Sequence, residues 1–293
     1  MRITLSVFAV KMLALAVLTS LQLAQAADKK VAETPLPWVP AKLPDGQPDV
    51  RGFWGAKYSG TYSLVNAGEN GQAGWPGKDG SIIPRGPDGK IPIREKRPSR
   101  IIDPADGQVP YLPWARAKQQ DLLDHFENPI KPGYVEGLAR CFPGGVSRQQ
   151  FGSVEIRQYP GYVLLLSGLS NRIIPLNGRP HIPANIKLWM SDSRGHWEGN
   201  TLVVDVTSSN SKHRLSNQGD FASDKVHIRE RFIFLDANTY RYEATYNDPS
   251  VFTRPWTLES PMRRTRLNEP NYEPEEYSCH EGDREFYALE PQS

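Results

Sequence analysis

The stretch VHIRERFIFLDANTYRYEATY, residues 226–246, decides the fold class because the character of its side chains alternates at every second position. One side of the first segment carries four apolar residues and one carboxylate, Val226, Ile228, Glu230, Phe232 and Phe234. One side of the second segment carries Tyr240, Tyr242, Ala244 and Tyr246, and Asp236-Ala237-Asn238 separates the segments. A period of two is typical of strands with one buried face. The stretch therefore predicts a hairpin with an aromatic inner face and a single acidic group.

Six further segments share this character and are separated by turn residues such as Pro160-Gly161 and Asn177-Gly178. With the two segments above, the strand candidates are residues 153–158, 161–169, 171–176, 201–206, 226–235, 239–246, 255–262 and 275–279, together with weaker strand material at 50–54 and 58–65. Short strands at this spacing, without βαβ alternation, predict a mainly β protein. We expect an antiparallel β-barrel, which would also remove exposed sheet edges.

The first part of the chain is rich in proline and glycine. Thirteen of the 26 prolines lie between Pro35 and Pro113, which disfavours continuous helix or central strand there. We expect residues 27–110 to form an extended arm that wraps the main body, with mobile loops. Residues 111–293 should form the barrel domain with one helix, which begins at Pro113 and stops at Asn128-Pro129.

Residues 1–26 have the pattern of a secretory signal peptide. Arg2 and Lys11 precede or flank an apolar run that ends in Ala24-Gln25-Ala26, a small-x-small cleavage site. A buried N-terminal helix is the alternative. No later apolar run approaches the roughly 20 residues that cross a bilayer. We expect an exported protein, periplasmic or secreted, without a stable membrane anchor.

The net charge and the lack of known sequence motifs argue against several classes of protein. Without Arg2 and Lys11 the formal net charge of +2 falls to zero, so the basic bias of nucleic-acid binders is missing. The basic run at residues 262–266 is most simply a solvated strand end. The six histidines show no metal-ligand spacing, and we find no phosphate loop, dinucleotide fingerprint or GxSxG elbow. The sequence thus predicts neither a metal nor a cofactor.

The chain has two cysteines, Cys141 and Cys279. In an oxidising compartment an even count favours a disulfide between them. The alternatives are two buried thiols, or a reactive cysteine beside His280.

The segment SRGHWEGNTLVVDV, residues 193–206, predicts a hairpin with a turn at Gly199-Asn200. That prediction leaves Asp192, Arg194, His196 and Asp205 unexplained. They could form a proton-transfer site in which a carboxylate orients a histidine, or a salt-bridged surface.

Glu230 would be desolvated inside an apolar barrel, which would suit a general acid or base. The alternative is a structural ion pair with Arg172 or Arg241. Arg179 and His181 follow an Asn-Gly turn and could bind a substrate carboxylate and act as a base, or lie in a solvated loop.

Several motifs resemble a family of exported bacterial proteins of unknown function. They are DSRGHWEGNTLVVD at 192–205, NRIIPLNGRPH at 171–181, Glu230-Arg231-Phe232 and DPSVFTRPWTLESPM at 248–262, within a similarity that spans roughly residues 43–279. This chain has Ser208-Ser209-Asn210 where members often carry Asn-Phe-Asn. The resemblance implies a family but no reaction, and the strand order is similar to lipocalin-like barrels by analogy.

Together these features favour an exported barrel that binds a small, partly apolar or aromatic molecule. We expect a cofactor-free acid-base enzyme such as an isomerase, lyase or cyclase. Glu230 and His196 would be acid or base, Asp205 or Asp192 would orient them, and Arg194 or Arg179 would stabilise an anion. Tyr240, Tyr242 and Tyr246 would line the cavity and His181 would contact the substrate. The alternatives are a non-catalytic periplasmic carrier, in which His196 and Glu230 lie apart, and an envelope interaction protein with a barrel filled by side chains. The oligomeric state is open.

Overall fold

The computed structural model describes residues 38–60, 63–65, 98–126, 129–168, 170–269 and 271–272. The predicted signal peptide, the strand candidate at 275–279 and Cys279 lie outside the described residues. The strands are β1 Gly52–Ala56, β2 Ile101–Asp103, β3 Ser153–Tyr159, β4 Tyr162–Ser167, β5 Ser170–Pro175, β6 Asp192–Glu198, β7 Thr201–Thr207, β8 His227–Asp236, β9 Thr239–Asn247 and β10 Trp256–Arg264. The helices are α2 Pro113–Asp124 and three short 3₁₀ turns, η1 Pro132–Tyr134, η2 Gly137–Arg140 and η3 Ser147–Phe151.

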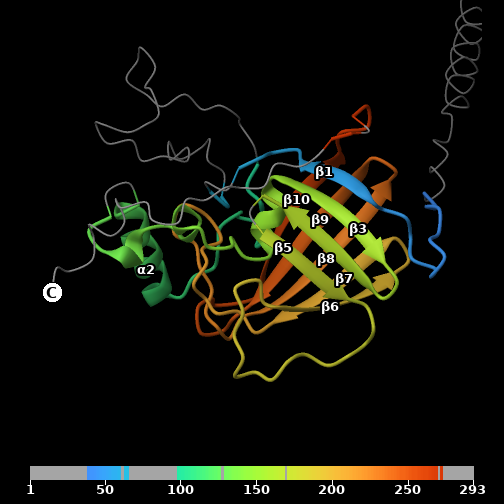
Figure 1. The fold of residues 1–293 in the computed structure, drawn as a ribbon. Coiled ribbons are helices and arrows are strands. Elements are labelled where there is room, and N and C mark those ends of the chain that lie inside the picture. Colours follow the sequence, from blue (N-terminus) through green and yellow to red (C-terminus); the bar gives the residue numbers. More distant parts are fainter. Residues whose placement is uncertain are drawn as a thin grey trace, which may run out of the picture. The chain divides into compact units, whose positions relative to one another are not determined.

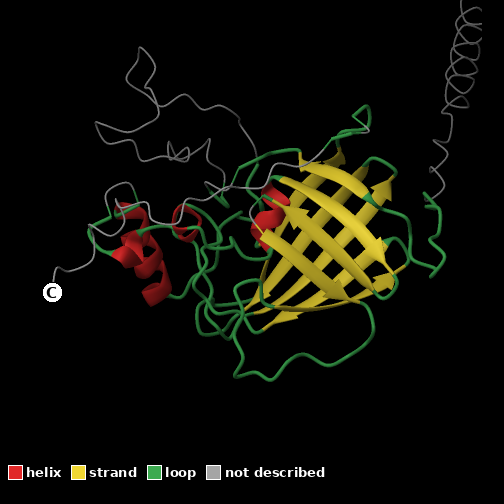
Figure 2. Ribbon diagram, viewed as in Figure 1, coloured by secondary structure: helices red, strands yellow, loops and turns green. Residues whose placement is uncertain are grey.

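Nine strands form one antiparallel sheet in the order β5-β4-β3-β1-β10-β9-β8-β7-β6, and β2 pairs with β10 off this path. The sheet curves until its two edge strands, β5 and β6, approach each other (Figures 1 and 2), so that it is nearly closed into a barrel. The predicted mainly β, antiparallel barrel class is therefore confirmed, and the described residues contain one α-helix.

The strand predictions from residue 153 to residue 262 each correspond to a strand of the sheet. The hairpin at Gly199-Asn200 is also present, and Gly199 has the positive φ of +58° that its turn requires. By contrast, none of the described residues between Tyr58 and Val65 belongs to a strand. Strand β1, from the segment predicted as a wrapping arm, lies within the sheet between β3 and β10.

The predicted helix begins at Pro113 as expected, because proline has no N–H to leave unpaired in a first turn. Helix α2 buries Ala115, Leu122 and Leu123, whereas Trp114, expected on the same face, is half exposed. None of the helices that the structure describes combines the length and the apolar character needed to cross a membrane.

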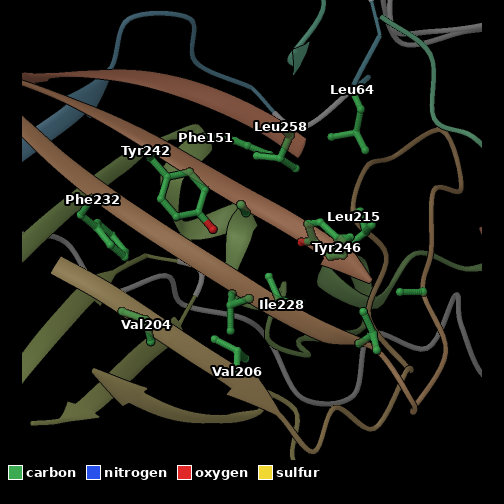
Figure 3. Close-up of a cluster of buried hydrophobic side chains, with 14 of the residues drawn as sticks. Leu64, Phe151, Val204, Val206, Leu215, Ile228, Phe232, Tyr242, Tyr246 and Leu258 are labelled. Atoms are coloured by element: carbon green, nitrogen blue, oxygen red, sulfur yellow. The ribbon is translucent and has the colours of Figure 1, made fainter. Parts of the chain in front are cut away.

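The assignment of inward-facing residues in β8 and β9 is confirmed. Val226, Ile228, Glu230, Phe232 and Phe234, like the tyrosines at 240, 242 and 246, are buried. Figure 3 shows Phe232, Tyr242 and Tyr246 projecting into this cluster of buried side chains. The rings pack against one another, for example Phe232 against Tyr242 with centroids 5.1 Å apart and Tyr246 against Trp256 at 4.7 Å. Aromatic packing of this kind stabilises the interior beyond the area it buries.

The two ends of the barrel differ. At one, the hairpin end, the strands are joined by the tight turns at Pro160-Gly161, Gly199-Asn200 and Ala237-Asn238. At the other, the loop end, the longer connections meet the start of β3, β6 and β8, and a short connection joins β4 to β5. Turn η3 lies at the loop end with all five of its residues buried, although four of them are polar.

Candidate functional sites

Inside the barrel, Glu230 is completely buried and is paired with Arg172 of β5, itself only 3% exposed. Arg172 Nη1 donates to Glu230 Oε1 at 3.0 Å, and Nη2 forms a short contact with Oε2. This is the structural ion pair with Arg172 that the sequence offered as the alternative to a desolvated acid. A carboxylate held by both ends of a guanidinium is a strong, oriented acceptor.

Two phenols extend this pair. Tyr242 Oη donates to Glu230 Oε1 at 2.6 Å, and Ser147 Oγ of η3 lies 2.9 Å from Tyr242 Oη and 2.6 Å from Tyr246 Oη. Because Tyr242 gives its one proton to Glu230, it must accept the proton of Ser147, which in turn accepts from Tyr246. We call Arg172, Glu230, Tyr242, Tyr246 and Ser147 the interior network.

Burial holds the phenols in their protonated form. Desolvation, with the negative charge of Glu230 as the next cause, raises the pKa of Tyr242 well above its usual value. Burial likewise raises the pKa of Tyr246. Both rings are therefore permanent hydrogen-bond donors at neutral pH, and they cannot serve as bases there.

Arg172 also spans the line where the barrel edges meet. Its Nε donates to Ser193 Oγ of β6 at 2.9 Å, so one guanidinium links β5 to both β6 and β8. Beside it, Gly195 of β6 lies against Ile174 and Leu176 so closely that a Cβ would stand 2.7 and 2.9 Å from their side chains. These contacts join β5 and β6 through side chains.

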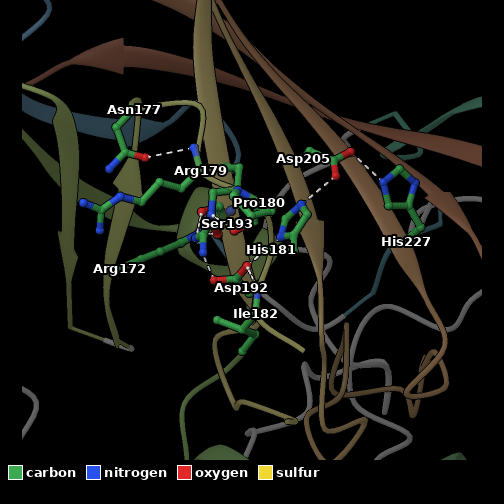
Figure 4. A network of polar contacts seen from close by, with 11 residues as sticks. Arg172, Asn177, Arg179, Pro180, His181, Ile182, Asp192, Ser193, Asp205 and His227 are labelled. Atoms are coloured by element: carbon green, nitrogen blue, oxygen red, sulfur yellow. Dashed lines mark hydrogen bonds and ion pairs between the residues drawn. The ribbon is translucent and has the colours of Figure 1, made fainter. Parts of the chain in front are cut away.

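A second polar group, the outer network, lies on the outer face of β6, β7 and β8 (Figure 4). His181, from the loop between β5 and β6, places Nδ1 2.6 Å from Asp192 Oδ2 and Nε2 2.8 Å from Asp205 Oδ2. His227 Nε2 lies 2.6 Å from Asp205 Oδ1. The four side chains form an unbroken series of carboxylate and imidazole.

The histidines keep Asp205 ionised. Partial burial acts to raise the pKa of Asp205, but the hydrogen bonds and charges of His181 and His227 outweigh it and lower the pKa overall. Both ring nitrogens of His181 face carboxylate oxygens, Nδ1 that of Asp192 and Nε2 that of Asp205. Arg194 completes the group by donating to Asp192 Oδ1 at 2.7 Å and to the carbonyl of Pro180 at 3.1 Å.

The predicted site residues thus divide into two groups. Asp192, Asp205, His181 and Arg194 are brought together outside the barrel, and the three tyrosines join Glu230 on the inside. His196 is exposed and pairs with Glu198 at 3.1 Å. Because its strand points it outward while Glu230 points inward, these two residues cannot act as a pair.

Other placements are less informative. Arg179 is exposed, and its backbone N–H donates to Asn177 Oδ1 at 3.2 Å. Tyr240 donates to Gln150 Oε1 at 2.7 Å, away from Glu230. Since Cys279 is outside the described residues, its disulfide with Cys141 remains a prediction.

Three residues of the two networks were not predicted from the sequence. His227 could have been found, because it shares the outward side of β8 with Arg229, which stands opposite Asp205 in the register. Ser193 could also have been assigned to the inside, since it alternates with outward-facing Asp192 and Arg194. Ser147 could not have been found, because a short polar turn ahead of a strand usually lies in solvent.

Within the part of the chain that the structure describes, no group of three or more His, Cys, Asp or Glu side chains is arranged to hold a metal ion. No protein-family model matches the chain, and neither a curated protein nor a solved structure shows significant similarity to it.

Proposed function

We propose that the protein binds a small, partly apolar molecule at the loop end of the barrel, as a carrier. The observation that supports this proposal is the burial of the polar turn η3 against an otherwise aromatic interior. Within the described residues, three of the buried polar atoms here have no hydrogen-bond partner: Gln149 Oε1, Gln150 Nε2 and Ser170 Oγ.

The other atom of each glutamine amide is hydrogen-bonded. Gln149 Nε2 donates to the carbonyl oxygen of Ser170 at 2.8 Å, and Gln150 Oε1 accepts from Tyr240. A buried polar group without a partner costs about 1–3 kcal/mol, so such groups are normally satisfied by water or a ligand. The three atoms without partners offer a ligand a carbonyl acceptor, an amide donor and a hydroxyl group. A ligand with hydroxyl or amide groups and an apolar body would match them.

The interior network favours binding over chemistry at this site. Glu230 accepts hydrogen bonds from Arg172 and Tyr242 on its two oxygens, so it is a fixed structural anion rather than a poised base. The separation of His196 from Glu230 is the arrangement expected of a carrier. With the predicted signal peptide, we place this carrier in the periplasm or outside the cell.

The test is a thermal unfolding screen of the mature protein with aromatic, terpenoid and sugar-acid compounds. A ligand that binds the native state raises the melting temperature. Replacement of Gln149 by Leu should abolish the shift produced by a positive compound. Gln120→Leu is the matched control, because Gln120 is an exposed glutamine of α2.

If no compound shifts the wild-type protein, or if Gln149→Leu responds as the wild type does, the binding proposal fails.

The outer network favours acid-base catalysis as a second candidate function. His227 is nearly half exposed, is oriented by Asp205 through Nε2, and makes no hydrogen bond through Nδ1 among the described residues. An imidazole oriented by a carboxylate suits proton transfer near neutral pH. If a compound from the screen is also converted, His227→Gln should stop turnover, while His196→Gln on the same face should not.

A further inference from the structure

The loop between β5 and β6 presents apolar side chains to solvent. In Figure 1 it lies apart from the strands, below β6. Its second half, IPANIKLWM at residues 182–190, is mostly apolar, yet Ile186 is 44% and Leu188 is 40% exposed. Beside them, Trp189 is half-buried and does not belong to the main hydrophobic core of the described residues. A group of exposed apolar side chains, unlike a single one, indicates a contact surface.

The backbone of this loop is held in place. The N–H of Leu188 donates to the carbonyl oxygen of Ser208 at 2.8 Å, and the carbonyl oxygen of Leu188 accepts from the N–H of Asn210 at 3.0 Å. Within the loop, the N–H of Ile186 donates to the carbonyl oxygen of Pro183 at 2.9 Å. An ordered backbone therefore presents these apolar side chains, so a partner that covers them does not have to order the loop first.

Basic residues border the apolar group. The ring of Trp189 stacks on Phe142 with centroids 4.5 Å apart, and the guanidinium of Arg140 lies 5.1 Å from the centroid of Phe142. Lys212 is close by, because a Cβ on Gly137 would stand 3.9 Å from both the carbonyl oxygen of Lys212 and Cβ of Phe142. Arg140 and Lys212 are both exposed. We call the following residues the loop surface: Arg140, Phe142, Ile186, Leu188, Trp189 and Lys212.

We propose that the loop surface binds the interface of a membrane that contains anionic lipids. Tryptophan is favoured at the level of the lipid head groups, where its ring contacts apolar chains and its N–H meets water or a head group. Ile186 and Leu188 enter the outer part of the hydrocarbon region, as the apolar side of an interfacial segment does. Arg140 and Lys212 meet the negatively charged head groups. The contact is peripheral and reversible.

The attraction to lipid charge comes from Arg140 and Lys212. Lys187 lies within the loop, but its Nζ stands 3.7 Å from Asp224 Oδ2, so it is paired within the chain. The same charges argue against a second copy of the chain as the partner, because a symmetric contact would bring the basic residues of two identical surfaces together. The inference goes beyond the proposed carrier function, since it concerns the outer surface and does not depend on what the barrel binds.

The experiment measures co-sedimentation of the full mature chain with vesicles of phosphatidylcholine, alone or mixed with phosphatidylglycerol. The wild type should bind the mixed vesicles better, and added salt should weaken this binding because it screens the charges. Leu188→Ser should weaken the binding about fivefold or more, since one leucine side chain no longer enters the hydrocarbon. Leu235→Ser is the matched control, because Leu235 of β8 is 51% exposed at the hairpin end.

A second pair of variants tests the charges. Lys212→Glu should reduce binding to the mixed vesicles, because it replaces an attractive charge by a repulsive one. Lys42→Glu is its control, since Lys42 is exposed and lies in the segment before β1, away from the loop surface. Ile186→Ser repeats the apolar test if Leu188→Ser does not fold.

Fluorescence locates the contact. Bromine-labelled lipid in the mixed vesicles should quench the tryptophan fluorescence of the wild type, and the quenching should be smaller in Trp189→Phe. Trp114→Phe, which removes the half-exposed tryptophan of α2, should not reduce it.

The proposal is overturned if the wild type does not bind the mixed vesicles, or if Leu188→Ser binds them as Leu235→Ser does. Wild-type quenching in Trp189→Phe would overturn it as well. A wild-type dimer that Leu188→Ser dissociates, with vesicle binding unchanged, would show that a second copy covers the loop surface instead.

Discussion

Arg172 of β5 and Glu230 of β8 form a buried ion pair across the line where the two edge strands of the barrel approach each other. The same guanidinium donates to Ser193 of β6. A single side chain therefore joins three strands at the one place where the ladder of the sheet is not continuous.

Removing either partner of this pair should be costly. Glu230→Gln leaves a charged guanidinium without its counter-ion in the interior, and Arg172→Met leaves the carboxylate. Breaking a buried pair in this way typically costs about 3–5 kcal/mol. Urea unfolding should show such a loss for each variant. The pair between the exposed Arg157 and the partly buried Glu155 is the comparison, and Arg157→Met should cost less than about 1 kcal/mol.

The close approach of Gly195 to β5 gives a steric test of the same junction. Gly195→Ala should destabilise the protein by about 1–3 kcal/mol, because its Cβ would press against Ile174 and Leu176. Gly133→Ala, where a Cβ would meet nothing within 4 Å, should change the unfolding free energy by less than about 0.5 kcal/mol. Equal effects of the two substitutions would contradict side-chain closure between β5 and β6.

His213 should make stability fall in mild acid. Its pKa is about 4 in the folded protein and near 6.5 in an unfolded chain, so between these values the unfolded chain binds a proton that the folded chain does not. Above pH 6.5 this imidazole does not lower the free energy of unfolding. As the pH falls from 6.5 towards 4, protonation of the unfolded chain lowers that free energy, and the loss reaches about 3 kcal/mol.

The measurement is the unfolding free energy at pH 7 and pH 4 for the wild type and for His213→Gln. The decline on acidification should be smaller in the variant by roughly that amount. His125→Gln, on the surface of the protein near α2, should leave the decline unchanged. A wild-type slope in His213→Gln would show that this imidazole does not stay neutral on folding.

The outer network should hold the loop of residues 176–191 against the barrel. His181 is the loop residue that contacts both Asp192 and Asp205, so Asp205→Ala should loosen the loop. Trypsin can report this at Lys187, which is exposed, whereas the bond after Arg179 is protected by Pro180. We expect cleavage several-fold faster than in the wild type.

Glu198→Ala is the control for this experiment, since Glu198 lies on the same outer face but pairs with His196 and Arg231 instead of the loop. Its cleavage rate should equal that of the wild type. If Asp205→Ala is cut no faster than Glu198→Ala, the outer network does not fasten the loop.

Much of the barrel could be predicted because its signals are local. The alternation in residues 226–246 assigns Glu230 and the tyrosines to the inside by geometry alone, since successive side chains of a strand point to opposite faces. The turn at Gly199-Asn200 needs a positive φ that glycine supplies. The same parity separates His196 from Glu230, although their residue types had suggested an acid-base pair.

The partners of these residues could not be read in the same way. Arg172 and Glu230 are 58 positions apart, and their contact depends on how far the sheet curves before β5 meets β6. Parity gives the side of a strand but not which strand stands across the barrel. Strand material was predicted at residues 50–54, which overlap β1, but the position of β1 between β3 and β10 was hidden for a related reason, because a local pattern does not show which strands a segment pairs with.

The sequence by itself determined that this chain forms antiparallel strands with an aromatic inner face and one inward carboxylate, because period and turn chemistry act between neighbours in the chain. Only the tertiary structure decided that η3 is buried and that Arg172 neutralises Glu230. Those outcomes depend on the sum of charges and hydrogen bonds that distant segments bring to one place, and no local pattern carries that sum.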